Sequence, residues 1–315
     1  MSAGPEDVNL DQKILSGDQE MLKENRDSKN RIQYLIESSL IDELMLTPKP
    51  GLVDDYDRGG MDEAVDMSVL LKGINAITPY LTDLFYAGYG WEKEPEFMFD
   101  ALRPLGDQAE TSMFRATGGI DTHRGLIFSM GIICAAAGYD YAQRGENRVA
   151  SILKLTERIM KGPVGRFYDG INQDRPRTNG ESIFLKYGIR GIRGEAENGF
   201  PIIRRVSLPA MAEYRRKHPD PEQNSAILTN VLLHIMTALE DTRVISQSDP
   251  GGLRWVQNRA RYILALGGAF TREGMDEIWD WNDDCSSIHI SPVGSGEILA
   301  ATLFLWRLSG SIFVI

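Results

Sequence analysis

Five polar clusters, each beside glycine or proline or at a predicted helix end, carry the side chains with which this sequence can do chemistry. In the first cluster, Pro48 and Pro50 restrict the backbone on either side of Lys49, so the lysine has little freedom left to lose on binding. A lysine held in this way suits a phosphate group as a point charge. We therefore predict that Lys49 and Asp54, which ends the cluster, contact a phosphorylated substrate. The alternative is a helix stop with an exposed lysine.

In the second cluster, the pair Gly118-Gly119 precedes a predicted helix, with Asp121 or Thr122 as its cap. A glycine turn that opens a helix exposes backbone N–H groups at the positive end of the helix dipole. His123 and Arg124 add further hydrogen-bond donors beside the same place. The pattern indicates a site for an anion, in particular a phosphate chain, although a capped turn between two helices would look the same.

The third cluster interleaves Arg190, Arg193, Glu195 and Glu197 with glycines, which favours a site that holds phosphate and metal together. The two carboxylates can ligate Mg²⁺, which takes one or two carboxylates in addition to substrate phosphates, or one of them can serve as a general base. A surface loop that neutralises its own charges is the alternative.

The last two clusters lie at predicted helix ends. Glu240 and Asp241 follow an apolar helix over residues 227–239, where the helix dipole disfavours negative charge, so they indicate a metal or cationic partner unless they are simply solvated. Ser291 and Ser295 precede the last helix. Ser295 is a suitable cap and the glycines around it let a phosphate approach, with simple capping as the alternative.

The elements that must position these clusters are helices. Apolar residues recur at three- and four-residue steps along most of the chain, and alternating runs typical of strands are absent. We predict a single all-α domain over residues 29–315, preceded by a polar extension over residues 1–28. A glycine- and arginine-rich segment, residues 162–205, is expected to be irregular and to converge on a ligand. Helices are predicted over residues 32–44, 66–87 (with Pro79 starting a second segment), 95–116, 122–143, 147–161, 208–217, 222–240, 252–266, 271–284 and 295–308.

Composition restricts the class of partner. The 315 residues include 34 basic and 45 acidic side chains, which gives a net charge of −11, and such a chain is a poor partner for nucleic acid or anionic lipid. The start of the chain lacks the apolar core of a signal peptide. The most apolar stretch, residues 298–315, is interrupted by Arg307 and Gly310 and is too short to span a bilayer. We expect a soluble protein of the cytoplasm.

Taken together, the clusters resemble the triphosphoribosyl-dephospho-coenzyme A synthase family, which makes the prosthetic-group precursor of citrate lyase and has close relatives that serve malonate decarboxylase. The resemblance covers residues 40–305 in one order. It is carried by Thr-Pro-Lys-Pro-Gly-Leu-Val-Asp (47–54), Leu-Arg-Pro-Leu-Gly (102–106), Ala-Thr-Gly-Gly-Ile-Asp-Thr-His-Arg-Gly (116–125), Arg-Gly-Glu-Ala-Glu-Asn-Gly-Phe-Pro (193–201), Glu-Asp-Thr (240–242) and Ser-Pro-Val-Gly-Ser (291–295).

The resemblance implies an all-α transferase that converts ATP and 3′-dephospho-coenzyme A into the 2′-triphosphoribosyl adduct and free adenine. It implies a functional link to the acyl carrier subunit of a lyase or decarboxylase, and it leaves a homo-oligomer open. The triphosphate would be held by Mg²⁺ and by the side chains of Lys49, His123, Arg124 and Arg193.

Breaking the N-glycosidic bond develops positive charge on the ribose, which nearby carboxylates stabilise. We expect Glu195 or Glu197 to act as the base, and Glu240, Asp241 and Glu195 to bind metal.

Three positions depart from the family pattern. Asp121 stands where the family usually has Asn, Val293 stands where it has Gly, and residues 61–67 lack the family's histidine. These departures keep two other hypotheses open. One is a divergent relative that cleaves or transfers the ribosyl group of another nucleotide. The other is a helical protein that binds a nucleotide without turnover.

Overall fold

The computed structural model describes residues 29–310, and these residues form helices joined by turns, without a strand. The prediction of an all-α fold is therefore confirmed, whereas the predicted extension over residues 1–28 lies outside the described residues. The first helix covers residues 29–44 within the described part of the chain. The helices that follow are α2 (Met67–Tyr89), α3 (Met98–Ala116), α4 (Arg124–Arg144), α5 (Val149–Asp169), α6 (Asn179–Tyr187), α7 (Gly191–Glu197), α8 (Leu208–Lys217), α9 (Asn224–Met236), α10 (Thr242–Gln247), α11 (Pro250–Ala265), α12 (Arg272–Ile288) and α13 (Val293–Ser309).

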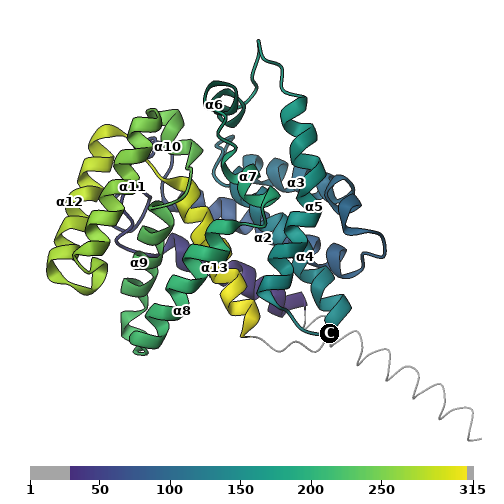
Figure 1. Cartoon of the computed structure of the whole chain (residues 1–315), viewed down its shortest axis with the longest axis horizontal. Coiled ribbons are helices and arrows are strands. Elements are labelled where there is room, and N and C mark those ends of the chain that lie inside the picture. The colour runs from purple at the N-terminus through teal and green to yellow at the C-terminus, as the bar shows by residue number, and fades with distance from the viewer. Residues whose placement is uncertain (1–28, 311–315) are drawn as a thin grey trace, which may run out of the picture.

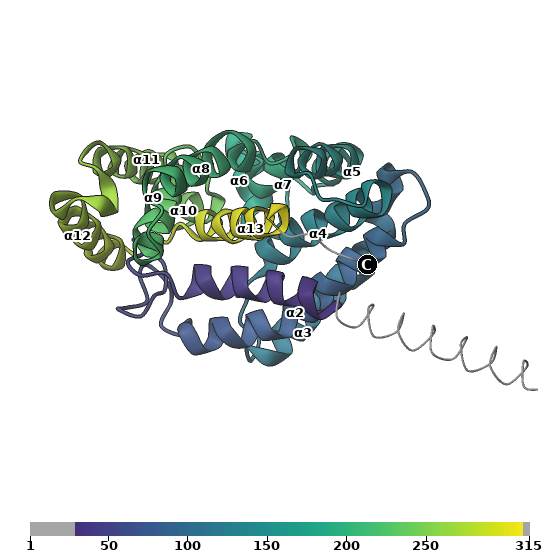
Figure 2. The same ribbon diagram turned by 90° about the horizontal axis from the view of Figure 1, so that it is seen from below.

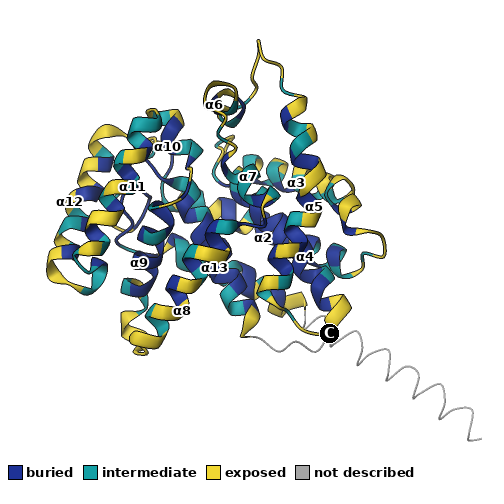
Figure 3. Cartoon of the chain, in the orientation of Figure 1, coloured by how far each residue is buried: buried dark blue, intermediate teal, exposed yellow. Residues whose placement is uncertain are grey.

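Helix α13 lies at the centre of the molecule. It passes between a group formed by α2 to α5 and a group formed by α9 to α12 (Figure 1), and the helix of residues 29–44 lies along one side of it (Figure 2). Colouring by burial shows that α13 and α4 are largely enclosed while the outer faces of α11 and α12 are exposed (Figure 3). One continuous apolar core joins the two groups.

Helices α2 and α4 approach each other very closely because glycines occupy the crossing. A β-carbon at Gly138 would lie 1.9 Å from the carbonyl oxygen of Phe85, and one at Gly88 would lie 2.0 Å from the carbonyl oxygen of Ala135. The run of small residues in α4 predicts such a central, closely packed helix, and the structure confirms it. Helix α4 is also long and apolar enough to cross a bilayer, but 78% of its most apolar window is buried inside the protein.

Two predictions about the elements are wrong. Pro79 does not start a second helix but lies inside α2, because packing against α3 and α4 outweighs the loss of one backbone hydrogen bond. The segment 162–205 is largely helical: it contains the last residues of α5, the whole of α6 and α7, and part of a short π-helix over Ile203–Ser207. Some of its glycines end helices, such as Gly188 with φ of 72° after α6, whereas others, such as Gly162 and Gly165, lie within α5.

Candidate functional site

The first predicted cluster is buried, which excludes the interpretation as an exposed helix stop. Lys49 is 2% exposed, and its Nζ donates to the carbonyl oxygen of Glu43 at 2.7 Å and to Glu43 Oε1 at 3.0 Å. Asp54 serves the loop itself, because its carboxylate accepts from the N–H groups of Lys49, Tyr56 and Asp57. Lys49 is therefore placed by a carboxylate of the preceding helix and by a turn that Asp54 organises.

The second cluster is arranged differently from the prediction. Gly118 and Gly119, with φ of 69° and 93°, end α3 rather than open α4, and the Gly119 N–H donates to the carbonyl oxygen of Phe114 at 2.7 Å. The glycine pair therefore does not form the predicted anion-binding turn. Instead, the two glycines end α3, and four residues separate Gly119 from Arg124, where α4 begins.

The N-cap of α4 is His123, so the prediction of Asp121 or Thr122 as the cap is wrong. The Asp121 carboxylate nevertheless accepts from the Arg124 N–H at 3.3 Å, at the start of the helix. The Arg124 side chain lies 3.4 Å from both Glu110 and Asp121 in two ion pairs. Burial lowers the pKa of His123 to about 4, so this ring is neutral at pH 7, and its Nδ1 lies 2.8 Å from Thr122 Oγ1. His123 thus offers a hydrogen bond to a substrate but not a positive charge.

The first turns of α4 and α13 meet around a cavity of about 60 Å³. Its polar lining comes from Glu43, Lys49, Thr122, His123 and Glu297, and we call it the polar cavity. A volume of this size holds a few water molecules. The polar cavity can therefore receive the reacting end of a ligand, while a triphosphate must lie outside it.

Glu297 was not predicted, and it is the most strongly perturbed carboxyl in the polar cavity. Burial raises its pKa to about 8, and the negative charges of Asp241, Asp121 and Glu43 act in the same direction, while the Leu126 N–H opposes them. Glu297 is consequently protonated at pH 7. It lies two residues after Ser295 of the fifth cluster, and it is the only Asp, Glu, Lys or Arg between residues 285 and 306. A single charged residue in such an apolar stretch is a sequence feature that indicates a buried carboxyl and could have identified Glu297 as a candidate site residue.

Glycines make room for these carboxylates. A β-carbon at Gly125 would lie 2.4 Å from Glu297 Oε2, and one at Gly296 would lie 2.9 Å from Glu43 Oε1. These glycines are needed for close approach rather than for an unusual backbone angle. Gly125 and Gly296 therefore allow α4, α13 and the first helix to bring their polar groups together.

The fourth cluster also differs from the prediction. Helix α9 ends at Met236, and Asp241 is the N-cap of the unpredicted helix α10, so the carboxylate faces a favourable dipole end rather than an unfavourable one. Asp241 accepts from Arg243 and Val244 through Oδ1 and from the Ser295 N–H through Oδ2, at 3.0 to 3.4 Å. Burial nevertheless raises the pKa of Asp241 to about 6. Asp241 thus joins the starts of α10 and α13, whereas Glu240 is exposed.

The two serines of the fifth cluster are both buried, and neither caps α13, whose N-cap is Pro292. The capping role predicted for Ser295 is therefore wrong, because Asp241 accepts from its backbone N–H instead. Ser291 donates its N–H to Gln247 Oε1 at 2.9 Å, and its Oγ is buried without a hydrogen-bond partner. The unpaired hydroxyl remains available to a ligand at the start of α13.

The third cluster forms α7, and its four charged side chains have different surroundings. Arg190 is ion-paired with Glu197 and lies over the ring of Tyr168 at 5.0 Å, so this pair neutralises itself. Burial raises the pKa of Glu195 to about 7, and the charge of Glu240 contributes. Glu195 Oε2 accepts from the Ile202 N–H at 3.0 Å. Of the two predicted bases, Glu195 is therefore the one with a free oxygen and a suitable pKa.

Within residues 29–310, no three His, Cys, Asp or Glu side chains are grouped so that they could hold a metal by themselves. Glu195, Glu240 and Asp241 thus do not form a closed protein cage. Asp241 has both oxygens occupied by backbone N–H groups, while Glu195 and Glu240 are close enough to affect each other's charge. The donor set suits a cation that takes its remaining ligands from phosphates and water, as Mg²⁺ does.

Residues 29–312 match the model of the ATP:dephospho-CoA triphosphoribosyl transferase family. A 2-(5″-triphosphoribosyl)-3′-dephosphocoenzyme-A synthase of Escherichia fergusonii is 35% identical over 275 residues, which cover 87% of this chain and 89% of that protein. The protein of the same name from Klebsiella pneumoniae is 32% identical over 279 residues, 88% of this chain and 91% of that protein. A probable synthase of Vibrio cholerae is 32% identical over 278 residues, 88% of each chain. No solved structure matches the chain.

Proposed function

This chain belongs to the ATP:dephospho-CoA triphosphoribosyl transferase family, and we propose from its geometry how its residues carry out the transfer. The reaction joins the ribose C1 of ATP to the 2′-oxygen of 3′-dephospho-coenzyme A. The bond between that carbon and adenine N9 breaks, the 2′-hydroxyl loses its proton, and adenine leaves with the bonding electron pair and takes up a proton. The enzyme is therefore a pentosyltransferase, and it needs one group to give a proton and one to take a proton.

The observation that carries the proposal is the position of the Glu297 carboxyl in the polar cavity, which Lys49 and His123 also line, with a pKa that burial raises to about 8. A buried carboxylic acid that stays neutral at pH 7 can donate a proton to a leaving group. Glu297 would give its proton to the departing adenine. Lys49 would then offset the negative charge that remains among Glu297, Glu43 and Asp241.

Glu195 is the group we propose to accept the proton of the 2′-hydroxyl. Its pKa of about 7 allows a large ionised fraction at neutral pH, and its second oxygen accepts no hydrogen bond from another described residue. Glu195 lies close enough to Glu240 for their charges to interact, and Asp241, the next residue, contacts the first turn of α13 that also carries Glu297. Acid and base would thus approach the reacting carbon from neighbouring elements. Glu197, already paired with Arg190, would hold α7 in place.

Mg²⁺ would arrive with the triphosphate of ATP and be held by Glu240 and the phosphate oxygens, where it would neutralise phosphate charge. Asp241 would not bind the metal, because both of its carboxylate oxygens already accept backbone N–H groups. Arg124 and the unpaired Ser291 hydroxyl are further phosphate contacts available at the starts of α4 and α13. We also propose a cytoplasmic location and, downstream, an acyl carrier subunit of citrate lyase or malonate decarboxylase as the recipient of the product.

Product analysis tests the reaction. Purified protein with Mg²⁺, ATP and 3′-dephospho-coenzyme A should yield adenine and the triphosphoribosyl adduct in equal amounts, measured by chromatography and mass spectrometry. Adenine without the adduct would mean hydrolysis or a different acceptor. Bound ATP without any adenine would mean that the protein only binds the nucleotide, and either result would overturn the proposal.

A further inference from the structure

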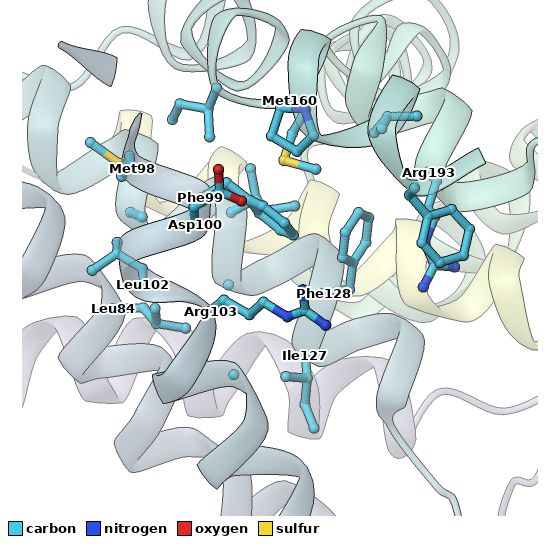
Figure 4. Close-up of a pocket in the computed structure, with 18 of the residues that line it drawn as sticks. Leu84, Met98, Phe99, Asp100, Leu102, Arg103, Ile127, Phe128, Met160 and Arg193 are labelled. Carbon is cyan, nitrogen blue, oxygen red and sulfur yellow. The ribbon is translucent and has the colours of Figure 1, made fainter. Parts of the chain in front are cut away.

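A second, larger cavity lies among α3, α4 and α5, with α7 at one end (Figure 4). Its volume is about 350 Å³, at the lower end of the range for sites that hold small organic ligands. The floor is apolar and includes Leu84, Met98, Ile127 and Met160, whereas three arginines, Arg103, Arg166 and Arg193, stand along its rim. We call it the arginine-rimmed pocket.

Two of the three arginines lack an ion pair at short range, although the charges of Glu110 and Glu181 act on Arg193 from a longer distance. Arg103 and Arg193 make no ion pair or hydrogen bond with another described residue, whereas Arg166 lies 2.6 Å from Asp100. Arg193 is held between aromatic rings, with its guanidinium carbon 4.0 Å from the centre of Phe167 and 5.3 Å from that of Phe128. Burial of its guanidinium lowers the pKa of Arg193. An anion would supply the missing partner.

The acidic residues that line the same pocket do not form ion pairs with Arg103 or Arg193. Asp100 is paired with Arg166, and Glu110 lies 3.4 Å from Arg124. Asp107 is exposed. In a chain of net charge −11, two unpaired guanidinium groups over an apolar floor are an uncommon arrangement, and they fit a ligand with an anionic head and an uncharged, partly apolar arm.

We propose that the arginine-rimmed pocket binds the acceptor, with its pantetheine arm on the apolar floor and its diphosphate at Arg103 and Arg193. This inference rests on the proposed function, because it takes 3′-dephospho-coenzyme A as the acceptor. ATP lacks an uncharged extension comparable to pantetheine, so it would leave the apolar floor of the pocket uncovered. The inference changes the role expected for Arg193, which the sequence assigned to the triphosphate of ATP.

The placement of the two cavities supports this division of the substrates. Ile127 lines the arginine-rimmed pocket, while its neighbour Leu126 lines the polar cavity. Glu110 lines the arginine-rimmed pocket and is paired with Arg124, the first residue of α4. An acceptor whose diphosphate lies on the rim can therefore extend its nucleoside across the start of α4 towards the polar cavity, where its 2′-hydroxyl would meet the ribose of ATP.

Gly106 offers a direct test, because it lines the pocket and a β-carbon there would meet no atom within 4 Å. The variant Gly106→Leu fills the pocket from within α3 and improves helix propensity. The matched control is Gly165→Leu in α5, where a β-carbon is equally free and which does not line the pocket. We expect Gly106→Leu to weaken calorimetric binding of 3′-dephospho-coenzyme A by about tenfold or more, with the KM for ATP unchanged and Gly165→Leu like the wild type.

The charge of the rim is tested by Arg103→Gln, with Arg115→Gln as the control on an exposed, pocket-free part of α3. Arg103→Gln should weaken binding of 3′-dephospho-coenzyme A by about tenfold and reduce its dependence on salt. Unchanged acceptor binding in both pocket variants, or an effect on ATP instead, would overturn the inference. Because binding is measured directly, acceptor binding in the pocket without adenine release would contradict the proposed reaction and leave the pocket assignment standing.

Discussion

Glu297 owes its protonation to its neighbours. Burial and three surrounding carboxylates raise its pKa to about 8, and only the glycine at position 125 leaves space for its carboxyl group. Sequence reasoning had found the segment but selected its serines, because a serine before a helix is a familiar cap. Lys49 could be selected from the sequence because restraint by two flanking prolines is a local effect, and its contact with the substrate stays a prediction. Glu43 was missed because its role depends on a contact with Lys49 that only the folded chain makes.

Gly125→Ala should disturb the polar cavity without unfolding the protein. A β-carbon there would lie 2.4 Å from Glu297 Oε2, so Glu297 must move, while alanine favours the helix by roughly 0.5–1 kcal/mol. We expect kcat to fall by about tenfold or more at an unchanged or higher melting temperature. Gly165→Ala is the control. A variant with full activity would show that the position of Glu297 does not matter.

Glu195→Gln distinguishes a base from a metal ligand. If Glu195 accepts the 2′-hydroxyl proton, kcat should fall by about a hundredfold or more at saturating Mg²⁺, and the rise of activity with pH through about 7 should disappear. Glu197→Gln should mainly loosen α7 and raise KM. Recovery of Glu195→Gln by excess Mg²⁺ would instead assign Glu195 to the metal.

At the scale of the elements, glycine decides how closely the helices approach. The spacing of apolar residues predicts most of the helices, including α4 with its run of small residues, because the apolar face of a helix depends on the local sequence alone. It did not predict the continuous α2 through Pro79, or α6, α7 and α10. These short helices depend on packing and on caps such as Asp241, and in the sequence their glycines look like those of an irregular loop.

Gly138→Ala should destabilise the protein by roughly 1–3 kcal/mol, because the added carbon would lie 1.9 Å from a backbone oxygen of α2 that cannot move away alone. Urea unfolding measures the change. In the control variant Gly165→Ala, the new methyl group meets nothing within 4 Å, and stability should rise slightly. Equal behaviour of the two variants would contradict the close contact of α2 and α4.

At the scale of the whole molecule, the acidic groups around α13 make stability depend on pH. The folded-state pKa of Glu297 is about 8 and that of Glu195 is about 7, both above the unfolded values. Their contribution to stability is complete below the unfolded pKa and is lost as the pH rises through the folded pKa. Burial lowers the pKa of His123 to about 4 in the folded protein. His123 therefore lowers the free energy of unfolding only as the pH falls below about 6.5, and it does not change the trend at higher pH.

The free energy of unfolding should therefore fall between pH 6.5 and 9, by up to about 2 kcal/mol from Glu297 alone. Urea titrations at fixed ionic strength measure it. In Glu297→Gln, which stays neutral, the decline should be smaller. A stability that rises over this range in the wild type would mean that these carboxyls are ionised in the folded protein.

The central claim is that the bond to adenine breaks at the polar cavity with a proton from Glu297. Single-turnover release of adenine by Glu297→Gln tests it most directly, with calorimetric ATP binding measured in parallel and Glu273→Gln, an exposed change on α12, as the control. We predict that Glu297→Gln binds ATP within a few-fold of the wild type and releases adenine about a hundredfold or more slowly. The wild-type rate should fall above pH 8, where Glu297 loses its proton, and this fall should be absent in the variant. Adenine release at the wild-type rate would contradict the account.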